Sequence, residues 1–387
     1  RKRTLFPYTT LFRSPLANLV VLPVFSFLVM PAIFVRLLLV ALAPPAADLS
    51  APAIQVLLQA FLDVQAFAGS SVPALRNPGP AVFLASSAIL ALAWGALLDA
   101  PRRALWPLAA LGLFVGSAAR PGEDPPPPGS LVVEVLPIGK GDALLVRCPG
   151  GERWLVDAGE SRTAGRLLAE IRGRGIRSLR GLVLTHADED HVGGAATLIQ
   201  GIPVREIRVS RPVRNDSPLR EVLEGFPEVP VRGLVAGQEV IPACGDPAVA
   251  LWPPPGEDLH GNAASLVFPL GLAGRTLLLT GDLEAPEEAR LLDLGRVPRA
   301  EVLKLGHHGS PGASSAAFLR AVSPRFALVS GYRTRRHRGP SAETRRRVDA
   351  AGALWLDSAA LGGLQVVLTP GGEVLAGGRR TPGPWRP

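Results

Sequence analysis

Residues that commonly bind metal ions gather in one short segment of the chain. The segment LVLTHADEDHVGG places two histidines and two aspartates within six residues, directly after an apolar run that predicts a β-strand. Two glycines follow, at which the backbone can turn tightly into a helix. Imidazole and carboxylate ligands together suit zinc, manganese or iron. The candidate ligands are His186, Asp188, Asp190 and His191.

Two further segments carry residues of the same kind just after predicted strands. Asp282 ends the segment LLLTGD, and His307 and His308 follow the segment VLKLG. A lone aspartate or histidine is more often structural than functional, but three strand-end clusters in one domain are not expected by chance. Together they predict a metal-dependent site.

The elements that must position these residues alternate between strands and helices. The runs LVVEVL, ALLVRC, RWLVDAG, SLRGLVLTH, ASLVFPL, RTLLLTGD, EVLKLGHHG and FALVSGY predict strands, and residues 163–174 predict a helix. Such alternation is typical of a layered α/β domain. The stretch GEDPPPPG cannot continue a helix and predicts a Pro-rich linker over 120–129, ahead of a domain over 130–387.

Long apolar runs precede the linker. Residues 15–44 carry Arg36 as their only charge, residues 81–98 and 104–118 are also apolar, and residues 53–67 are amphipathic. We expect transmembrane α-helices within 15–119, in a multi-pass protein of the cell inner (cytoplasmic) membrane. Arg102 and Arg103 lie in the short loop before the last run. Because arginine-rich short loops tend to stay cytoplasmic, the metal domain is expected on the outer side.

The first 14 residues are set apart from the fold. The segment TLFPYTTLFRS resembles the translation of a sequencing-library adapter joined to a gene fragment. We therefore expect residues 1–14 to be foreign and the native protein to continue upstream. A genuine basic leader is the alternative.

Charge and cysteine content narrow the classes of function. The 387 residues carry a formal net charge of +8, which suits nucleic acid or anionic lipid, although a genomic bias towards arginine explains it equally well. Cys148 and Cys244 exclude a disulfide-rich scaffold and could pair if the domain is exported. An arginine cluster could hold a nucleic-acid backbone or form a solvated helix face: Arg333, Arg335, Arg336, Arg338, Arg345, Arg346 and Arg347.

The order of the motifs resembles that of a known family. The series DAG, H-x-D-x-D-H, TGD, HHGS is similar to that of metallo-β-lactamase-fold domains in ComEC-type DNA internalisation (competence) proteins, and SPLANL resembles the end of their membrane region. The resemblance implies an αββα metallo-β-lactamase sandwich preceded by transmembrane α-helices. It also implies DNA uptake across the cytoplasmic membrane, with DNA, membrane lipid and other competence-machinery proteins as partners.

The resemblance assigns roles to individual residues and implies two divalent metals, zinc or manganese. Asp282 would bridge both metals, and Asp190 and Asp282 are the expected catalytic residues. The remaining ligands would be His186 and Asp188 for one metal, with Asp190, His191 and His307 for the other.

Other residues are expected around the metals rather than on them. Substrate contacts are expected from His308, Ser310, Lys304 and Asn262. Asp157 would orient the ligand loop, and Asp142 would have a structural role or lie at the edge of the site.

The chain departs from the family pattern at three places. Pro137 and Lys140 stand in PIGKGDA where the family typically has Asp and Gln. The third histidine motif is missing before ASLVF, where His260, a further candidate ligand, and Asn262 are found. His337 is displaced from Pro340, where the family often has a His-Pro pair.

The expected activity is hydrolysis of phosphodiesters in incoming single- or double-stranded DNA. Two metals about 3.5–4 Å apart can supply a hydroxide and polarise a phosphoryl oxygen. One alternative is a membrane-tethered metallo-hydrolase of a small substrate, such as a lactone or β-lactam, although a tether needs only one helix. Another is a non-catalytic module that guides DNA, which a depleted first metal site would favour.

Overall fold

The computed structural model describes residues 126–212, 217–330 and 340–378, together with the single residues 32, 52, 55, 56 and 59. Nearly all of them belong to one compact unit, Glu123–Arg172 with Ile176–Pro387. Within this described part, no helix is both long and apolar enough to cross a membrane. The predicted adapter segment 1–14, most of the predicted transmembrane region 15–119 and Arg333 to Arg338 lie outside the described residues.

Two sheets form the centre of the unit. The strands of the first are β1 (Leu131–Val135), β2 (Leu144–Arg147), β3 (Arg153–Val156), β4 (Gly181–Leu184), β5 (Ile207–Ser210), β6 (Val231–Leu234), β14 (Leu364–Leu368) and β15 (Val374–Gly378). The strands of the second are β9 (Phe268–Leu272), β10 (Arg275–Leu279), β11 (Val302–Lys304), β12 (Phe326–Val329) and β13 (Leu354–Asp357). Their orders are β15-β14-β1-β2-β3-β4-β5-β6 and β13-β12-β11-β10-β9, and β7 (Glu239–Ile241) pairs with β8 (Ala248–Val249) in a small third sheet.

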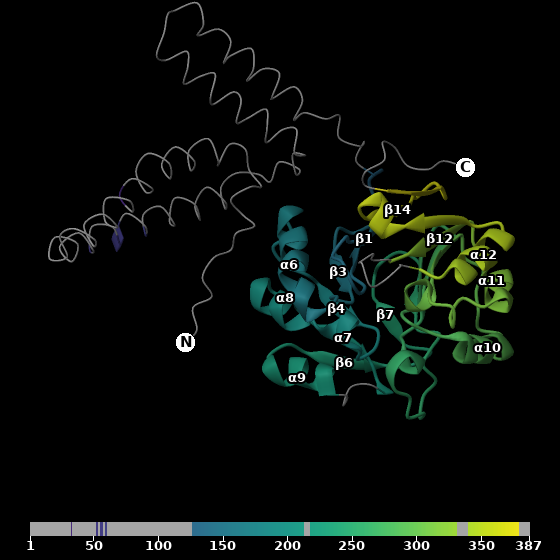
Figure 1. The fold of residues 1–387 in the computed structure, drawn as a ribbon, viewed down its shortest axis with the longest axis horizontal. Coiled ribbons are helices and arrows are strands. Elements are labelled where there is room, and N and C mark those ends of the chain that lie inside the picture. The colour runs from purple at the N-terminus through teal and green to yellow at the C-terminus, as the bar shows by residue number, and fades with distance from the viewer. Residues whose placement is uncertain are drawn as a thin grey trace, which may run out of the picture. The chain divides into compact units, whose positions relative to one another are not determined.

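Helices cover the outer faces of the two large sheets. The first group is α6 (Ala164–Gly173), α7 (Glu189–Val192), α8 (Ala195–Gly201) and α9 (Ser217–Gly225), and the second is α10 (Ala285–Asp293), α11 (Ala316–Val322) and α12 (Ala342–Ala350). Figure 1 shows α6, α8 and α9 along one side of the domain and α10, α11 and α12 along the opposite side, with the strands between them. The short helix α13 (Ser358–Leu361) follows β13.

The alternation of side chains along each strand explains why four layers form. In β2, Leu144 and Val146 belong to the core between the sheets, while Leu145 packs into the core beneath the first group of helices. In β10, Leu277 joins the central core and Leu278 joins the core beneath the second group. Because successive residues of a strand face opposite sides, apolar residues at both positions require cover on both faces. The predicted αββα sandwich is confirmed.

Parallel pairing brings the ends of the motif-bearing strands together. Strands β3 to β6 are mutually parallel, as are β10 to β13. The segments that follow parallel strands emerge at the same edge of a sheet, which is where α/β folds place ligands. The motif loops after β3, β4, β10 and β11 therefore converge.

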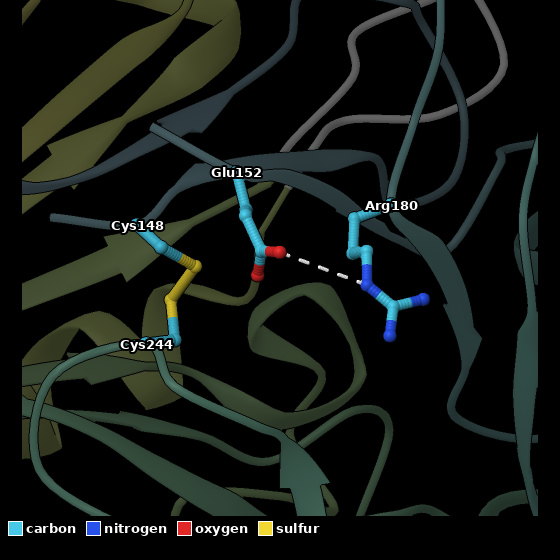
Figure 2. The surroundings of a disulfide bond; sticks show 4 residues. All are labelled: Cys148, Glu152, Arg180 and Cys244. Carbon is cyan, nitrogen blue, oxygen red and sulfur yellow. Dashed lines mark ion pairs between the residues drawn. A yellow bond between two sulfur atoms is a disulfide. The ribbon is translucent and has the colours of Figure 1, made fainter. Parts of the chain in front are cut away.

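The two cysteines of the chain form a disulfide that the sequence left open. Cys148 directly follows β2, Cys244 follows β7, and the bond links residues 96 positions apart. Figure 2 shows the disulfide near the ion pair of Glu152 with Arg180, whose Oε1 and Nε atoms are 3.7 Å apart. Both cysteines are buried, so the bond ties the first sheet to the β7–β8 segment within the core.

Candidate metal centre

Four side-chain donors meet where the motif loops converge. Asp282 Oδ2 lies 3.2 Å from His191 Nε2 and 3.4 Å from His308 Nε2. Asp190 Oδ2 lies 3.7 Å from the same nitrogen of His308. Tetrahedral ligands about 2.0–2.1 Å from a zinc ion are roughly 3.3–3.4 Å apart, close to these spacings. We call these four residues the compact donor set.

Several buried atoms at this place lack a hydrogen-bond partner among the described residues. They are His186 Nε2, His191 Nε2, His308 Nε2 and Asp282 Oδ1. Leaving buried polar atoms unsatisfied costs about 1–3 kcal/mol each, so their convergence needs a physical cause. A divalent cation supplies one, because imidazole nitrogens and carboxylate oxygens are its ordinary ligands. The residues present therefore fit a divalent metal.

Asp157 and Thr185 orient His191. The backbone of Asp157 is left-handed, with φ 59°, as the chain leaves β3. One oxygen of Asp157 accepts a hydrogen bond from the Thr185 amide, and the other lies 2.8 Å from the Thr185 hydroxyl and 2.8 Å from His191 Nδ1. Because Nδ1 is held by Asp157, Nε2 of His191 is the nitrogen left to bind a metal.

The side chains of the two adjacent histidines in the HHGS segment lie in different surroundings. Both have left-handed backbones, with φ 45° at His307 and 51° at His308. His308 enters the compact donor set, whereas His307 is 36% exposed and its Nδ1 lies 2.7 Å from Glu284 Oε1. We expected His307 to be the ligand and His308 to contact substrate. The structure places His308 among the donors and His307 beside Glu284, at a turn where both residues have left-handed backbones.

Lys304 is also placed differently from the prediction. Its side chain is buried, forms an ion pair with Asp142 and donates a hydrogen bond to the Gly281 carbonyl oxygen at 3.1 Å. A buried ammonium in this position cannot reach a substrate at the surface. Asp142 lies deeper than the site edge, since its Oδ1 is 3.3 Å from His308 Nδ1. Lys304 therefore balances the carboxylates of the site instead of facing the substrate.

Burial and neighbouring charges set the protonation of the donors. Burial opposes the charged form of His308, but Asp282 and Asp142 outweigh it and raise the pKa of His308 to about 9. Burial and the nearby His191 lower the pKa of His186 to about 3. Burial acts to raise the pKa of Asp282, but His191 and His308 bring it well below its usual range. A metal bound to His308 must replace a proton, so metal binding is expected to release protons and weaken at low pH.

The residues expected for the first metal are only partly gathered. The ligand atoms of His186, His191 and Asp282 lie within 4.8 Å of one another, and all three side chains are buried. His186 Nε2 lies 3.8 Å from Asp188 Oδ2, and the Asp188 side chain is 47% exposed. Asn262 has a buried, unpartnered Oδ1 within the described part, while its Nδ2 lies 3.3 Å from His307 Nδ1. His260 is 62% exposed and lies 3.3 Å from Asp258, so the structure does not place it with the donors. The first set is therefore open and rich in oxygen.

Supporting residues that the sequence did not reveal complete the centre. Ser265 accepts a hydrogen bond from the Asp282 amide at 3.0 Å, and the Ser330 hydroxyl lies 3.1 Å from His308 Nδ1. Ser310, an expected substrate contact, is partly exposed, and its carbonyl accepts a hydrogen bond from Thr344. A serine carries no distinctive sequence signal, so only the fold identifies these contacts.

The described part of the arginine cluster is largely used by the fold. Arg345 pairs with Asp349 at 2.9 Å and lies over the ring of Trp355. Arg347 pairs with Glu343 and donates hydrogen bonds to the carbonyls of residues 311, 313 and 314. Arg346 is exposed. Arg347 therefore braces the loop after His308, and phosphate contacts by the cluster stay a prediction.

Comparisons with known proteins agree with both halves of the chain. Residues 136–331 match the family described as the metallo-beta-lactamase superfamily, and residues 5–102 match the competence protein family. ComE operon protein 3 of Bacillus subtilis (strain 168) is 28% identical over 54% of this chain and 29% of its own length. Competence protein ComA of Neisseria gonorrhoeae is 30% identical over 73% of this chain and 39% of its own length. The chain thus spans less than two fifths of either relative.

Solved structures include a distant match. A metallo-β-lactamase of Cronobacter sakazakii with the HARLDQ motif has a TM-score of 0.34 and 17% identity, covering 50% of this chain and 90% of its own. A TM-score and an identity this low give no support beyond the family match.

Proposed function

Because the chain belongs to the metallo-β-lactamase superfamily and joins that domain to a competence-protein segment, as ComEC-type DNA internalisation proteins do, we propose that it acts in DNA uptake across the cytoplasmic membrane. Its metal domain hydrolyses phosphodiesters of the incoming DNA. The convergence of unpartnered buried donors on the compact donor set carries this proposal. Membrane lipid and other competence proteins are the further partners.

The chain offers two sets of ligands for the metals. The compact donor set would hold one ion, and His186, Asp188 and Asn262 would hold a second with Asp282 shared between them. Bound zinc or manganese would supply an activated water and polarise the phosphoryl oxygen. Asp157 keeps His191 in orientation, and the buried Lys304 limits the repulsion among the carboxylates.

The open side of the centre suits a large substrate. Asp188 and His307 are partly exposed, and Ser310, which closely follows His307 in sequence, is also partly exposed. A nucleic-acid strand can therefore approach without passing through an enclosed pocket. His307, no longer a proposed ligand, is available to contact the substrate from this side.

The function is tested with the full chain in detergent, stripped by a chelator and reloaded with zinc or manganese. We expect no cleavage of end-labelled single- or double-stranded DNA without metal and cleavage after reloading. The same preparations are assayed with a lactone and a β-lactam. Cleavage of a small substrate alone would establish the tethered hydrolase instead. Metal-loaded protein that binds DNA but never cuts it would establish the non-catalytic guide.

We further infer that the metal domain lies on the outer side of the inner membrane. The disulfide of Cys148 with Cys244 supports this, because disulfides persist in oxidising compartments and are rare in the cytosol. The short loop with Arg102 and Arg103 is expected to stay on the cytoplasmic side. The last apolar run would then lead outward and carry the metal domain to the outer side.

The disulfide makes the side of the membrane testable. Cells are quenched with acid and free thiols are blocked before the protein is denatured. In the unaltered chain, Cys148 and Cys244 should then give two maleimide adducts only after the disulfide is reduced. A reporter cysteine at an exposed site, Arg166→Cys on α6, should react with an impermeant reagent in cells whose inner membrane is intact. Cys148→Ser is the control, because it frees Cys244 and gives an adduct without disulfide reduction. Reaction of the reporter only after the inner membrane is opened would place the domain in the cytoplasm.

A further inference from the structure

An open groove lies between two helices on the side of the domain opposite α6. Its lining residues come from α11 and α12, which Figure 1 shows next to each other, and its volume is about 500 Å³. The charged residues that line it are Arg320, Arg346, Arg347 and Glu343. The other lining residues are alanines, so large side chains do not fill the space. We call it the arginine groove.

Two arginines of the groove carry charges that no acidic side chain neutralises. Arg320 and Arg346 are exposed, and neither has an acidic partner among the described residues. Arg346 donates one hydrogen bond, from Nε to the Ala342 carbonyl of its own helix at 3.4 Å, which uses one of its five N–H donors. Arg347 differs, because it pairs with Glu343 at 2.8 Å. Three arginines and one glutamate therefore give the groove a net charge of +2.

The groove adjoins the loop that leaves the compact donor set. Thr344 of α12 donates a hydrogen bond to the carbonyl of Ser310, two residues after His308, at 2.8 Å. One amino group of Arg347 lies 3.1 Å from the Thr344 hydroxyl and donates to the Pro311 carbonyl at 3.0 Å. The helix that carries Arg346 is thereby fastened to the open side of the metal centre, where Ser310 is partly exposed.

We propose that the arginine groove binds the phosphodiester backbone of the DNA strand beyond the metal centre, through Arg320 and Arg346. The inference rests on the proposed function and adds a second place where the substrate is held. A guanidinium group is always charged and can bind a phosphate through two parallel hydrogen bonds. Because the groove is concave and adjoins the donor loop, an extended strand suits it better than the flat surface of a membrane.

The test measures binding of a labelled single-stranded oligonucleotide to the metal-free full chain in nanodiscs of zwitterionic lipid, by fluorescence anisotropy over a range of salt concentrations. We expect Arg320→Gln combined with Arg346→Gln to weaken binding at low salt by about tenfold or more, as for the loss of a hydrogen bond between charged groups. The slope of log affinity against log salt should fall by about 1.4, because each phosphate contact to a single strand contributes about 0.7. After metal is reloaded, KM for DNA should rise with kcat little changed, because neither arginine is among the donors.

Two double variants serve as controls. Arg320→Lys with Arg346→Lys keeps both charges and should retain the salt slope. Arg177→Gln with Arg205→Gln removes the same charge from exposed positions before β4 and β5, at the sheet edge opposite the motif loops, and should behave as the unaltered chain. An equal fall of the slope in this second control would show attraction by net charge alone and would overturn the inference.

The outcomes separate the groove from the proposed nuclease. DNA binding that depends on Arg320 and Arg346 in a chain that cuts no DNA would uphold the groove and overturn the nuclease. DNA cleavage with an unaltered KM and salt slope in the glutamine double variant would overturn the groove alone. The same variant is tested for binding to vesicles of mixed phosphatidylglycerol and phosphatidylcholine. Loss of vesicle binding with DNA binding unaltered would assign the groove to a membrane surface and overturn the inference.

Discussion

Replacing His308 with alanine should abolish metal binding and DNA cleavage, while the same change at His307 should leave metal binding intact. His308 Nε2 is within 3.4 Å of Asp282 Oδ2 and 3.7 Å of Asp190 Oδ2, so its loss opens the compact donor set. Loss of an outer partner of a ligand already lowers metal affinity about 10–100-fold, and loss of the ligand itself should exceed that. Metal content of the purified full chain and equilibrium metal titration measure the effect.

His307→Ala is an unusually close control for this experiment. It is the neighbouring residue, has the same chemistry and has the same left-handed backbone, but it contacts Glu284 and Asn262 instead of the compact donor set. The affinity of the compact donor set for its metal should change by less than about threefold, because His307 contacts none of its four residues. If His307→Ala lost the metal and His308→Ala retained it, the proposed assignment of His308 as the ligand would be wrong.

Replacing Lys304 with methionine should destabilise the domain by about 3–5 kcal/mol, because the change removes the lysine partner of the buried Asp142 carboxylate and leaves it only His308. Lys304 and Asp142 are both nearly inaccessible to solvent, and the ammonium also donates a hydrogen bond to the Gly281 carbonyl. Chemical unfolding followed by tryptophan fluorescence measures the loss. A chelator is kept present so that changed metal affinity does not contribute.

Two variants separate charge burial from general damage at Lys304. Lys140→Met removes the other lysine of the site, which is 40% exposed, and should cost less than about 1 kcal/mol. Asp142→Asn in the Lys304→Met background should recover part of the lost stability, because it removes the uncompensated charge. Equal losses from Lys304→Met and Lys140→Met would contradict the role assigned to the buried pair.

Local patterns predicted the layers and the meeting of the loops. The helix expected over 163–174 is present as Ala164–Gly173, and the strands before the metal motifs end where the motifs begin. These elements can be predicted from the sequence because each combines an apolar run with a glycine or a polar turn. Strands β5 to β8 and β13 to β15 were not predicted, because they lack a motif at their ends.

The placements that the sequence did not predict depend on information that is not local. Adjacent histidines have the same chemistry, and only the left-handed turn decides that His308 and not His307 joins the donors. From the sequence, a lysine next to a motif could lie at the surface or in the interior. Lys304 is buried because it pairs with Asp142, which is 162 positions away in the chain. The disulfide likewise depends on β2 and the β7–β8 segment lying together. These side-chain positions are determined by tertiary packing, which the local sequence does not show.

The pairing of β1 has a consequence for how the domain is made. β1 hydrogen-bonds to β2 on one side and to β14 on the other. Residues 131–135 therefore cannot complete their strand pairing until residues 364–368 have been synthesised. Contacts between segments so far apart in the chain form slowly, since a long loop must be closed first. All the donors precede β14 in the order of synthesis. The donors are therefore synthesised before the eight-stranded sheet can close.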